Sequence, residues 1–218
     1  MRLLSLQIGL PHSYGNSDAS DPYDCFWTTG FYKETVHRTV FASRHHLIGD
    51  GQADLKNHGG PDKAICAYSA DHAAHWQTAL GLALPAGAFG ENFTTLGVVE
   101  SDLCIGDVFR VGDVVLQISQ PRQPCWKLAR RWRIRDLAAQ VEQTGRTGWY
   151  FRVLTEGDIT APADFARLER PHPEWTVAAA NDIMHHRKND LAAARALADC
   201  PALSESWRSA LARRSAQN

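Results

Sequence analysis

The sequence has no long hydrophobic segment. Of its 218 residues, 44% are hydrophobic, but no run approaches the roughly 20 apolar residues that cross a bilayer. The first twelve residues are interrupted by Gln7 and lack a small-residue cleavage pattern, so they do not fit a leader peptide. We expect a strand there, with Leu4, Leu6 and Ile8 on one face, and a cytoplasmic protein without a membrane partner.

A large charge of one sign is also lacking. The chain has 23 basic and 24 acidic side chains, a net charge of −1, so no overall field attracts nucleic acid or anionic membranes. We expect no stable nucleic-acid partner, because the arginines of one predicted helix face are typical of a solvated surface and no regular aromatic platform accompanies them. These are Arg130, Arg131, Arg133 and Arg135.

Paired cysteines and common cofactor motifs are missing as well. The five cysteines are an odd number without a C-x-x-C pair, which favours free thiols in a reducing compartment over a disulfide scaffold. His72 and His75 have helical spacing but no third ligand nearby, so no zinc site is expected. The sequence also lacks a Walker loop and any flavin, haem or iron–sulfur motif.

Strand-forming and turn-forming segments dominate the first 170 residues. The polar stretch 49–63 is long for a loop in a compact domain, which is typical of a functional loop. Two helices are expected, one over 69–80 with Ser69 as N-cap and one from Cys125 to a C-capping Gly145. Later strands are expected at 64–68, at 105–119 as a hairpin turning at Gly112–Asp113, at 149–154 and at 164–170.

The composition changes after Pro171 and Pro173 to Ala, Leu, Arg and His, without a strand pattern. Three short helices fit there, at 176–187, 190–199 and 204–214, and Ser204 is suited to cap the third. We therefore predict a β-barrel-dominated α+β domain over residues 1–170 and a small all-α appendage over 172–218. An appendage of that size needs docking to be stable.

The segment 119–128, SQPRQPCWKL, holds the strongest candidate for chemistry, Cys125. Two prolines fix the backbone, and a helix is expected to begin next to the thiol. A helix N-terminus together with Arg122 and Lys127 favours the thiolate, which is both a nucleophile and a soft-metal ligand. From the residues alone, an inert packed cysteine remains an equal alternative.

The segment 55–64, LKNHGGPDKA, is a second candidate. Gly59 and Gly60 let the backbone approach a ligand closely. Lys56, His58 and Lys63 surround them with cationic or hydrogen-bonding groups, which suits a phosphate or another anion. An ordinary surface turn explains the same residues equally well.

The segment 89–97, FGENFTTLG, places Glu91 and Asn92 between a glycine and a strand. A carboxylate beside an amide can recognise the donor and acceptor edge of a heterocycle. The same pair can simply hold a turn.

In their order along the chain, six motifs resemble the MOSC domain, which is named for the C-terminal part of molybdenum cofactor sulfurases. The last three helices resemble the C-terminal module of its stand-alone bacterial, YiiM-like branch, so the resemblance covers the full chain. The motifs are L-x-G-D-G-Q-x-D (47–54), H-G-G-P-D-K-A (58–64), F-G-E-N-F (89–93), I-G-D-V-F (105–109), Q-P-R-Q-P-C (120–125) and T-G-x-x-G-W (144–149).

This resemblance implies a MOSC-type barrel with a cofactor cleft at one end, and a molybdenum cofactor whose metal Cys125 binds. It implies reduction of N-hydroxylated small molecules, such as hydroxylaminopurine-type base analogues, to their amines in a two-electron step. The implied cofactor-binding residues are Lys56, His58, Gly59, Gly60, Asp62, Lys63, Tyr68, Glu91, Asn92 and Arg122.

The resemblance leaves several alternatives open. The chain has no region for the desulfurase domain of full-length sulfurases, and its electrons would have to come from a separate reductase. A carrier of the cofactor or its sulfur, without turnover, would use the same cleft. A metal-free hydrolase with Cys125 and His58 is a third alternative. The helical appendage is suited to close the cleft, to form a homodimer or to dock the electron donor.

Overall fold

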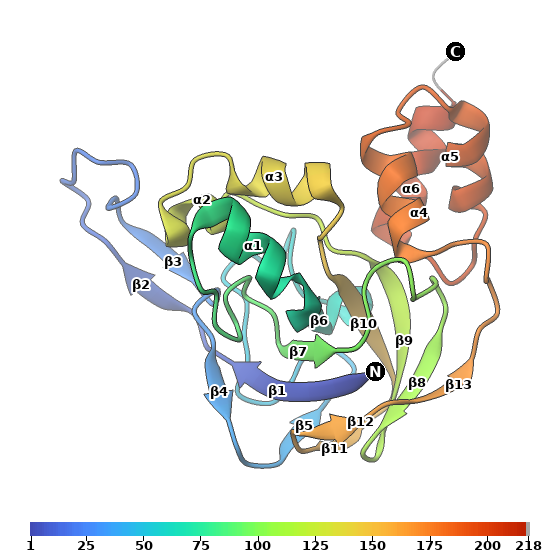
Figure 1. Cartoon of the computed structure of the whole chain (residues 1–218), viewed down its shortest axis with the longest axis horizontal. Helices are drawn as coiled ribbons and strands as arrows, with labels where there is room; N and C mark the ends of the chain where they lie inside the picture. Colours follow the sequence, from blue (N-terminus) through green and yellow to red (C-terminus); the bar gives the residue numbers. More distant parts are fainter. Residues whose placement is uncertain (217–218) are drawn as a thin grey trace.

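The computed structural model describes residues 1–216 and contains a curled sheet of nine strands (Figure 1). Two small two-stranded sheets accompany it, β2 (His12–Tyr14) with β3 (Trp27–Thr29) and β5 (Val40–Ala42) with β11 (Gly157–Ile159). Strands β6 and β7 are parallel, and the other pairs of the large sheet are antiparallel. Its strands are β1 (Arg2–Ile8), β4 (Glu34–Val36), β6 (Ile65–Ser69), β7 (Phe93–Leu96), β8 (Val108–Val111), β9 (Val114–Pro121), β10 (Trp149–Thr155), β12 (Ala163–Asp164) and β13 (Ala166–Glu169).

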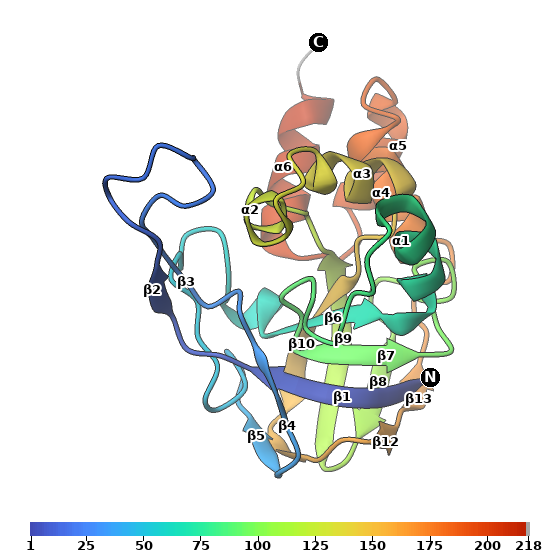
Figure 2. The ribbon, with the colours of Figure 1, turned by 60° about the vertical axis from the view of Figure 1, so that its left-hand side comes forward.

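The sheet curls because its two edges are consecutive segments of the chain. The order β12-β1-β7-β6-β10-β9-β8-β13 begins and ends on strands separated only by Phe165. That ring stacks on Phe151, with centroids 6.1 Å apart, and contacts Phe93 and Phe109 inside the curl. In Figure 2, β1, β7 and β6 cross in front of β8, β9 and β10. The expected strand-dominated barrel is thus present as a half-barrel.

The first strand forms as expected, but its inward face differs from the alternation in the sequence. The register between β1 and β7 shifts between Leu3 and Ser5, which is a β-bulge. Leu3, Leu6 and Gln7 are fully buried as a result, whereas Leu4 is 37% exposed. The expectation that Leu4 shares a face with Leu6 was wrong, because the bulge reverses the alternation.

The single helix expected after Pro124 is two helices, α2 (Lys127–Trp132) and α3 (Leu137–Thr144). The chain leaves α2 at Arg133, which adopts a left-handed φ of 55°. Tertiary contacts hold it there, because its guanidinium bonds to Asp21 and Asp24. The predicted end of the second helix at Gly145 is confirmed, with φ 69°.

Three further helical pieces precede this region in the chain. The 3-10 turn Pro61–Lys63 ends the long polar loop, and a second, Ala70–His72, leads into α1 (Ala73–Leu80). Ser69 caps that turn by accepting from the N–H of Asp71, as its position predicted.

The last three helices dock on the barrel as one module. They are α4 (Val177–His185), α5 (Leu191–Ala198) and α6 (Glu205–Ser215), and they stand over the end of β9 (Figure 1). Main-chain bonds join the two parts, from Ile105 N to Trp175 O at 2.8 Å and from Ser204 N to Ser119 O at 2.9 Å. Both parts share one buried apolar cluster, so the module has no separate core. Ser204 caps α6, as predicted.

The β2–β3 arm projects from the barrel on the left of Figure 1 and packs against α2. Arg130 donates to Tyr23 O at 3.2 Å and lies over the Trp27 ring. Arg131 donates to Phe31 O and Gly87 O. These two arginines are half-buried and hold the arm against α2. The expectation that they belong to a solvated helix face was therefore wrong.

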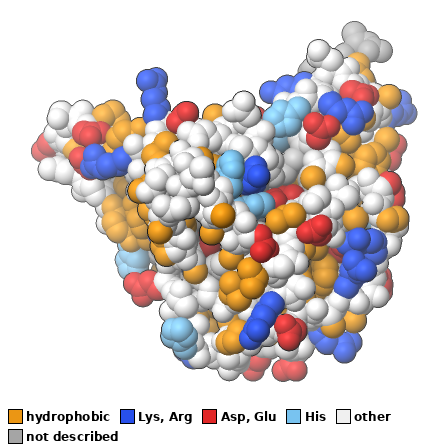
Figure 3. All heavy atoms as spheres, in the orientation of Figure 1, with side chains coloured by type: hydrophobic (Ala, Val, Ile, Leu, Met, Phe, Trp, Pro, Cys, Tyr) orange, Lys and Arg blue, Asp and Glu red, His pale blue; other side chains and the backbone are white. Residues whose placement is uncertain are grey.

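On the face drawn in Figure 3, basic and acidic side chains are interspersed. Within residues 1–216, none of the helices combines the length and the apolar character needed to cross a bilayer.

Candidate functional site

A cleft lies where β9 ends and α2 begins. Cys125 is on its wall and is partly exposed, as a reactive or metal-binding thiol must be. We refer to it as the Cys125 cleft. It brings together seven of the residues singled out in the sequence, namely His58, Gly59, Lys63, Asn92, Arg122, Cys125 and Lys127.

Arg122 is the most informative of these residues, because its guanidinium is buried in the cleft at 4% exposure. Its backbone N–H donates to Gly148 O at 3.0 Å and its Nη2 donates to Phe89 O at 2.6 Å. Its Nη1 is also buried and has no hydrogen-bond partner among the described residues. Because an unpaired buried charged donor is costly, this atom is suited to a ligand acceptor that enters the cleft.

Gly59 of the glycine loop also lines the cleft, and Gly60 follows it in the chain. Gly60 has φ 83°, and a Cβ there would meet nothing within 4 Å, so its backbone faces open space. Lys63 Nζ donates to Asn57 O at 2.9 Å, and burial lowers the pKa of this lysine. Burial, together with the charge of Lys127, lowers the pKa of His58 to about 4. His58 is therefore a neutral hydrogen-bonding group at neutral pH.

Five residues from the sequence-based list do not line the Cys125 cleft, namely Lys56, Gly60, Asp62, Tyr68 and Glu91. Asp62 accepts from Arg152 Nη2 at 2.6 Å and from the N–H of Glu205, so it joins the barrel to α6. Glu91 accepts from the N–H groups of Gly87 and Phe89 and holds the turn before β7.

Tyr68, another of these residues, lies under α1. Its ring stacks on Phe89 with centroids 4.0 Å apart, and its hydroxyl accepts from Trp76 and donates to Arg146 O.

Asn92 does line the cleft, but its amide is already bonded. Its Oδ1 accepts from Cys66 N at 3.1 Å and its Nδ2 donates to Asp50 Oδ2 at 3.0 Å. Asp50 also accepts from Lys33, which neutralises that lysine inside the cleft. Asn92 therefore shapes the floor of the cleft through the barrel backbone.

Several residues of the cleft were not predicted from the sequence, notably Gln52, Gln123 and Tyr150. Tyr150 and Cys66 are cross-strand partners of β10 and β6, and this pairing is what directs both to the cleft. Burial raises the pKa of Tyr150 and raises that of Cys66 to about 11, so Cys66 remains a thiol. Cross-strand pairing has no counterpart in the linear sequence, whereas Gln123 lies inside the Q-P-R-Q-P-C motif.

A second cavity adjoins the cleft on the side of the helices, and we refer to it as the helical-side chamber. Its barrel wall includes Gln120 and Lys56, which the sequence analysis had placed with the anion-binding residues. Its module wall is formed by Met184, Ser206, Trp207 and Ala210. Five residues line both cavities and form the boundary between them, namely His58, Lys63, Gln123, Cys125 and Tyr150.

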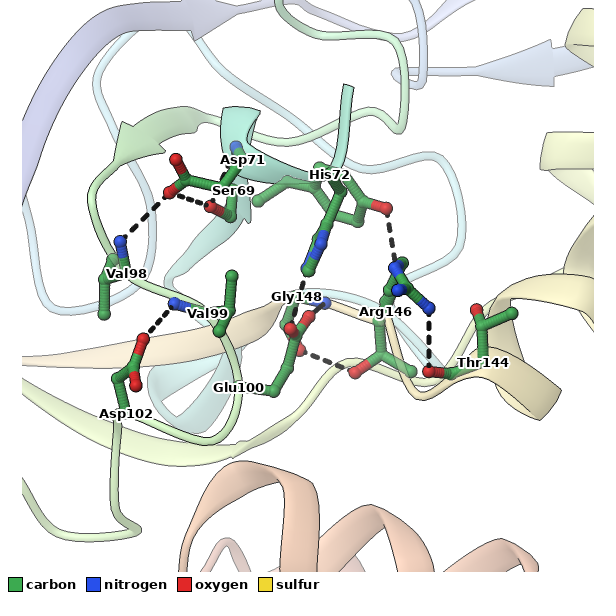
Figure 4. Close-up of polar contacts among 12 residues, drawn as sticks. Ser69, Asp71, His72, Val98, Val99, Glu100, Asp102, Thr144, Arg146 and Gly148 are labelled. Atoms are coloured by element: carbon green, nitrogen blue, oxygen red, sulfur yellow. Dashed lines mark hydrogen bonds and ion pairs between the residues drawn. The ribbon is translucent and has the colours of Figure 1, made fainter. Parts of the chain in front are cut away.

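A buried polar network supports the Arg122 segment from behind. Glu100 accepts from Gly148 N at 2.7 Å and pairs with His72 Nε2 at 2.7 Å, as Figure 4 shows. The carbonyl of Gly148 accepts from Arg122 N and from Thr147 Oγ1. Thr147 Oγ1 in turn accepts from Asn181 Nδ2 of α4 at 2.8 Å. The end of β9 is thus tied to the helical module through one loop, 144–148.

Comparison with known protein families finds two matches that together cover most of the chain. The model of the MOSC domain matches residues 54–164, and that of the YiiM-like 3-alpha helix domain matches residues 175–217. The chain belongs to the MOSC family. MOSC domains are associated with binding of the molybdenum cofactor.

Relatives of this MOSC protein cover most of its length. The uncharacterized protein YflK of Bacillus subtilis is 47% identical over 83% of this chain and 81% of its own. The crystal structure of YiiM from Geobacillus stearothermophilus covers 98% of both chains at 36% identity with a TM-score of 0.81. A protein of Gibberella moniliformis named "Reductase" is 35% identical over 81% of this chain, which corresponds to 31% of the fungal protein.

The Cys125 cleft of this MOSC protein fits the family's cofactor. The orphaned Nη1 of Arg122 provides a donor, and Gly59 brings the backbone of the glycine loop to the cleft wall, which suits an anionic, acceptor-rich group. Cys125 provides a sulfur ligand at the edge of the same cleft. Within residues 1–216, no group of three or more His, Cys, Asp or Glu side chains is arranged to hold a metal ion.

Proposed function

We propose that this protein holds the molybdenum cofactor through Cys125 and reduces N-hydroxylated small molecules to amines. The observation that carries the proposal is the position of Cys125, between a buried guanidinium with a free N–H and a second chamber open to a small molecule. Membership of the MOSC family and similarity to the fungal protein named "Reductase" support it.

In this proposal the cofactor-binding residues are those that face the Cys125 cleft. Arg122 donates through Nη1 to acceptors of the cofactor, and Lys63 and the backbone around Gly59 and Gly60 complete the anion site. Cys125 is the protein's ligand to the metal. Lys33 contributes no free charge, because Asp50 pairs with it.

When bound, the cofactor would supply the two electrons that break the N–O bond. The balanced change converts R–NH–OH, two electrons and two protons into R–NH₂ and water, so the protein must also deliver protons. Lys63 lines both cavities, and burial lowers its pKa, which makes its ammonium a stronger acid. We assign it as the proton donor to the leaving oxygen.

The electrons come from outside the chain in this proposal, from a separate reductase. A cytoplasmic setting is consistent with five cysteines that are all free thiols.

The first test replaces Cys125 with Ser and uses Cys66→Ser as the matched control, because Cys66 lines the same cleft with a buried thiol. We expect near-stoichiometric molybdenum in the wild type and in Cys66→Ser, and loss of both molybdenum and hydroxylamine reduction in Cys125→Ser. Full metal content and normal turnover in Cys125→Ser would rule the assignment out. A loaded wild type that consumes no substrate with a chemical reductant would favour the carrier function instead.

A further inference from the structure

The helical-side chamber differs in chemistry from the Cys125 cleft that it adjoins. The cleft holds a buried guanidinium, whereas the chamber is lined by the amides of Asn57, Gln120 and Gln123, the hydroxyls of Tyr150 and Ser206, and apolar groups. Lys56 and Lys63 lie on its barrel side, and no Asp or Glu is among the described residues that line it. It is therefore suited to an uncharged or weakly anionic molecule with both apolar and hydrogen-bonding surface.

The apolar surface of the chamber comes from the helical module. Met184 of α4 is 6% exposed and Trp207 of α6 is 1% exposed, so both are held by packing rather than free to move. Ala210, one turn along α6, leaves room that a larger side chain would fill. Met184 and Trp207 therefore form a fixed apolar wall beside the open position at Ala210, and the two glutamines are suited to the hydrogen-bonding edges of a flat ring.

The module wall is fixed to the barrel at several points around the chamber. Ser206 Oγ donates to Gln120 Oε1 at 3.2 Å, and Glu205 N donates to Asp62 Oδ2 at 3.0 Å. Arg152 Nη1 donates to Ala202 O at 3.1 Å. The chamber is therefore formed before a ligand arrives, which lowers the entropic penalty of binding.

We propose that the helical-side chamber is the substrate subsite, and that Met184, Trp207 and Ala210 select planar N-hydroxylated heterocycles over smaller hydroxylamines. This inference rests on the proposed function, because it places the reacting N–OH group at the Cys125 boundary. The cofactor and the substrate then approach the boundary residues from opposite sides. In this arrangement the helical module, rather than the barrel, determines which substrates bind.

The test fills the chamber with Ala210→Phe and compares it with Ala212→Phe, an exposed position on the same helix that does not line the chamber. 6-Hydroxylaminopurine is the planar substrate and hydroxylamine is the small one. We expect Ala210→Phe to raise KM for the purine on the order of tenfold while KM for hydroxylamine is unchanged. Molybdenum content should match the wild type.

A binding measurement separates the subsite from turnover. Calorimetry of the loaded, oxidised protein with 6-aminopurine, the product, should show the same loss of affinity in Ala210→Phe and none in Ala212→Phe. If Ala210→Phe does not fold, Ala210→Leu replaces it, with a smaller effect in the same direction.

The outcomes distinguish a failure of the substrate subsite from a failure of the proposed reductase function. Reduction of both substrates by the wild type, with KM and product affinity unchanged in Ala210→Phe, would overturn the subsite alone. A loaded wild type that reduces neither substrate would overturn the proposed function, and the subsite with it.

Discussion

At the scale of single residues, His58 makes a titration prediction. Its pKa is about 4 in the folded protein because of burial and the nearby Lys127, against about 6.5 in an unfolded chain. The unfolded state therefore binds the proton more tightly, so stability is full above pH 6.5 and falls as the pH drops toward 4. We expect His58 to account for up to about 2 kcal/mol of stability lost between pH 7 and 5.

The measurement is urea unfolding at pH 7 and at pH 5 for the wild type and His58→Gln. The variant should lose less stability than the wild type over this interval. His45→Gln is the control, because His45 is exposed and lies outside the cleft. Equal losses in the wild type and His58→Gln would show that this imidazole titrates normally.

At the scale of elements, hydrogen bonds made by the loop 144–148 link the end of β9 to α4. Thr147 Oγ1 accepts from Asn181 and donates to the carbonyl of Gly148, which holds Arg122 N. We expect Thr147→Val, which keeps the shape, to cost about 1–2 kcal/mol, because buried polar groups lose partners. It should also change the rate at which iodoacetamide alkylates Cys125, because the segment that carries the thiol loses its support.

The matched control for this loop is Thr144→Val. Thr144 donates to Gln140 O within α3 and is not bonded to Gly148. Its effect on stability should stay below about 0.5 kcal/mol. A Thr147→Val protein with unchanged stability and unchanged alkylation would show that the loop does not position the site.

Elements were predictable from sequence where local chemistry decides them. Ser69, Ser204 and Gly145 cap helices through bonds to their own neighbours, so each was correctly placed. The break at Arg133 and the bulge after Leu3 depend on partners far along the chain, Asp21 and β7, which no local pattern contains.

The site was predictable to the extent that motifs encode it. The motifs carrying His58, Lys63, Arg122 and Cys125 do meet in one cleft, although whether these residues bind the cofactor stays a prediction. Tyr150 and the module wall were missed, because cross-strand pairing and docking bring them there.

At the scale of the whole molecule, Asp62 joins the barrel to the helical module. Its carboxylate accepts from Arg152 Nε at 3.0 Å and from Glu205 N at the start of α6. We expect Asp62→Ala to cost about 1–3 kcal/mol and to raise protease sensitivity in the module, because a charge-assisted link is lost. Urea unfolding and limited proteolysis measure the two effects.

Asp164→Ala is the control for this link, since Asp164 is exposed on β12. The comparison also tests the role that the MOSC resemblance implied for Asp62. If Asp62→Ala lost molybdenum while its stability and protease resistance stayed normal, Asp62 would belong to the cofactor site rather than to the docking surface.

The two edge strands of the sheet, β12 and β13, lie on either side of Phe165, and their late position in the chain determines when the barrel can assemble. Strand β1, made first, pairs with residues 163–164, and β8 pairs with the segment just after Phe165. The sheet therefore cannot complete its ladder during synthesis until about three quarters of the chain has been made. Contacts of such long sequence separation slow folding, and the apolar inner faces of β1, β6 and β7 have to wait for their last partners. We therefore expect a ribosome-bound chain of this protein to expose these apolar faces until residues 163–169 emerge.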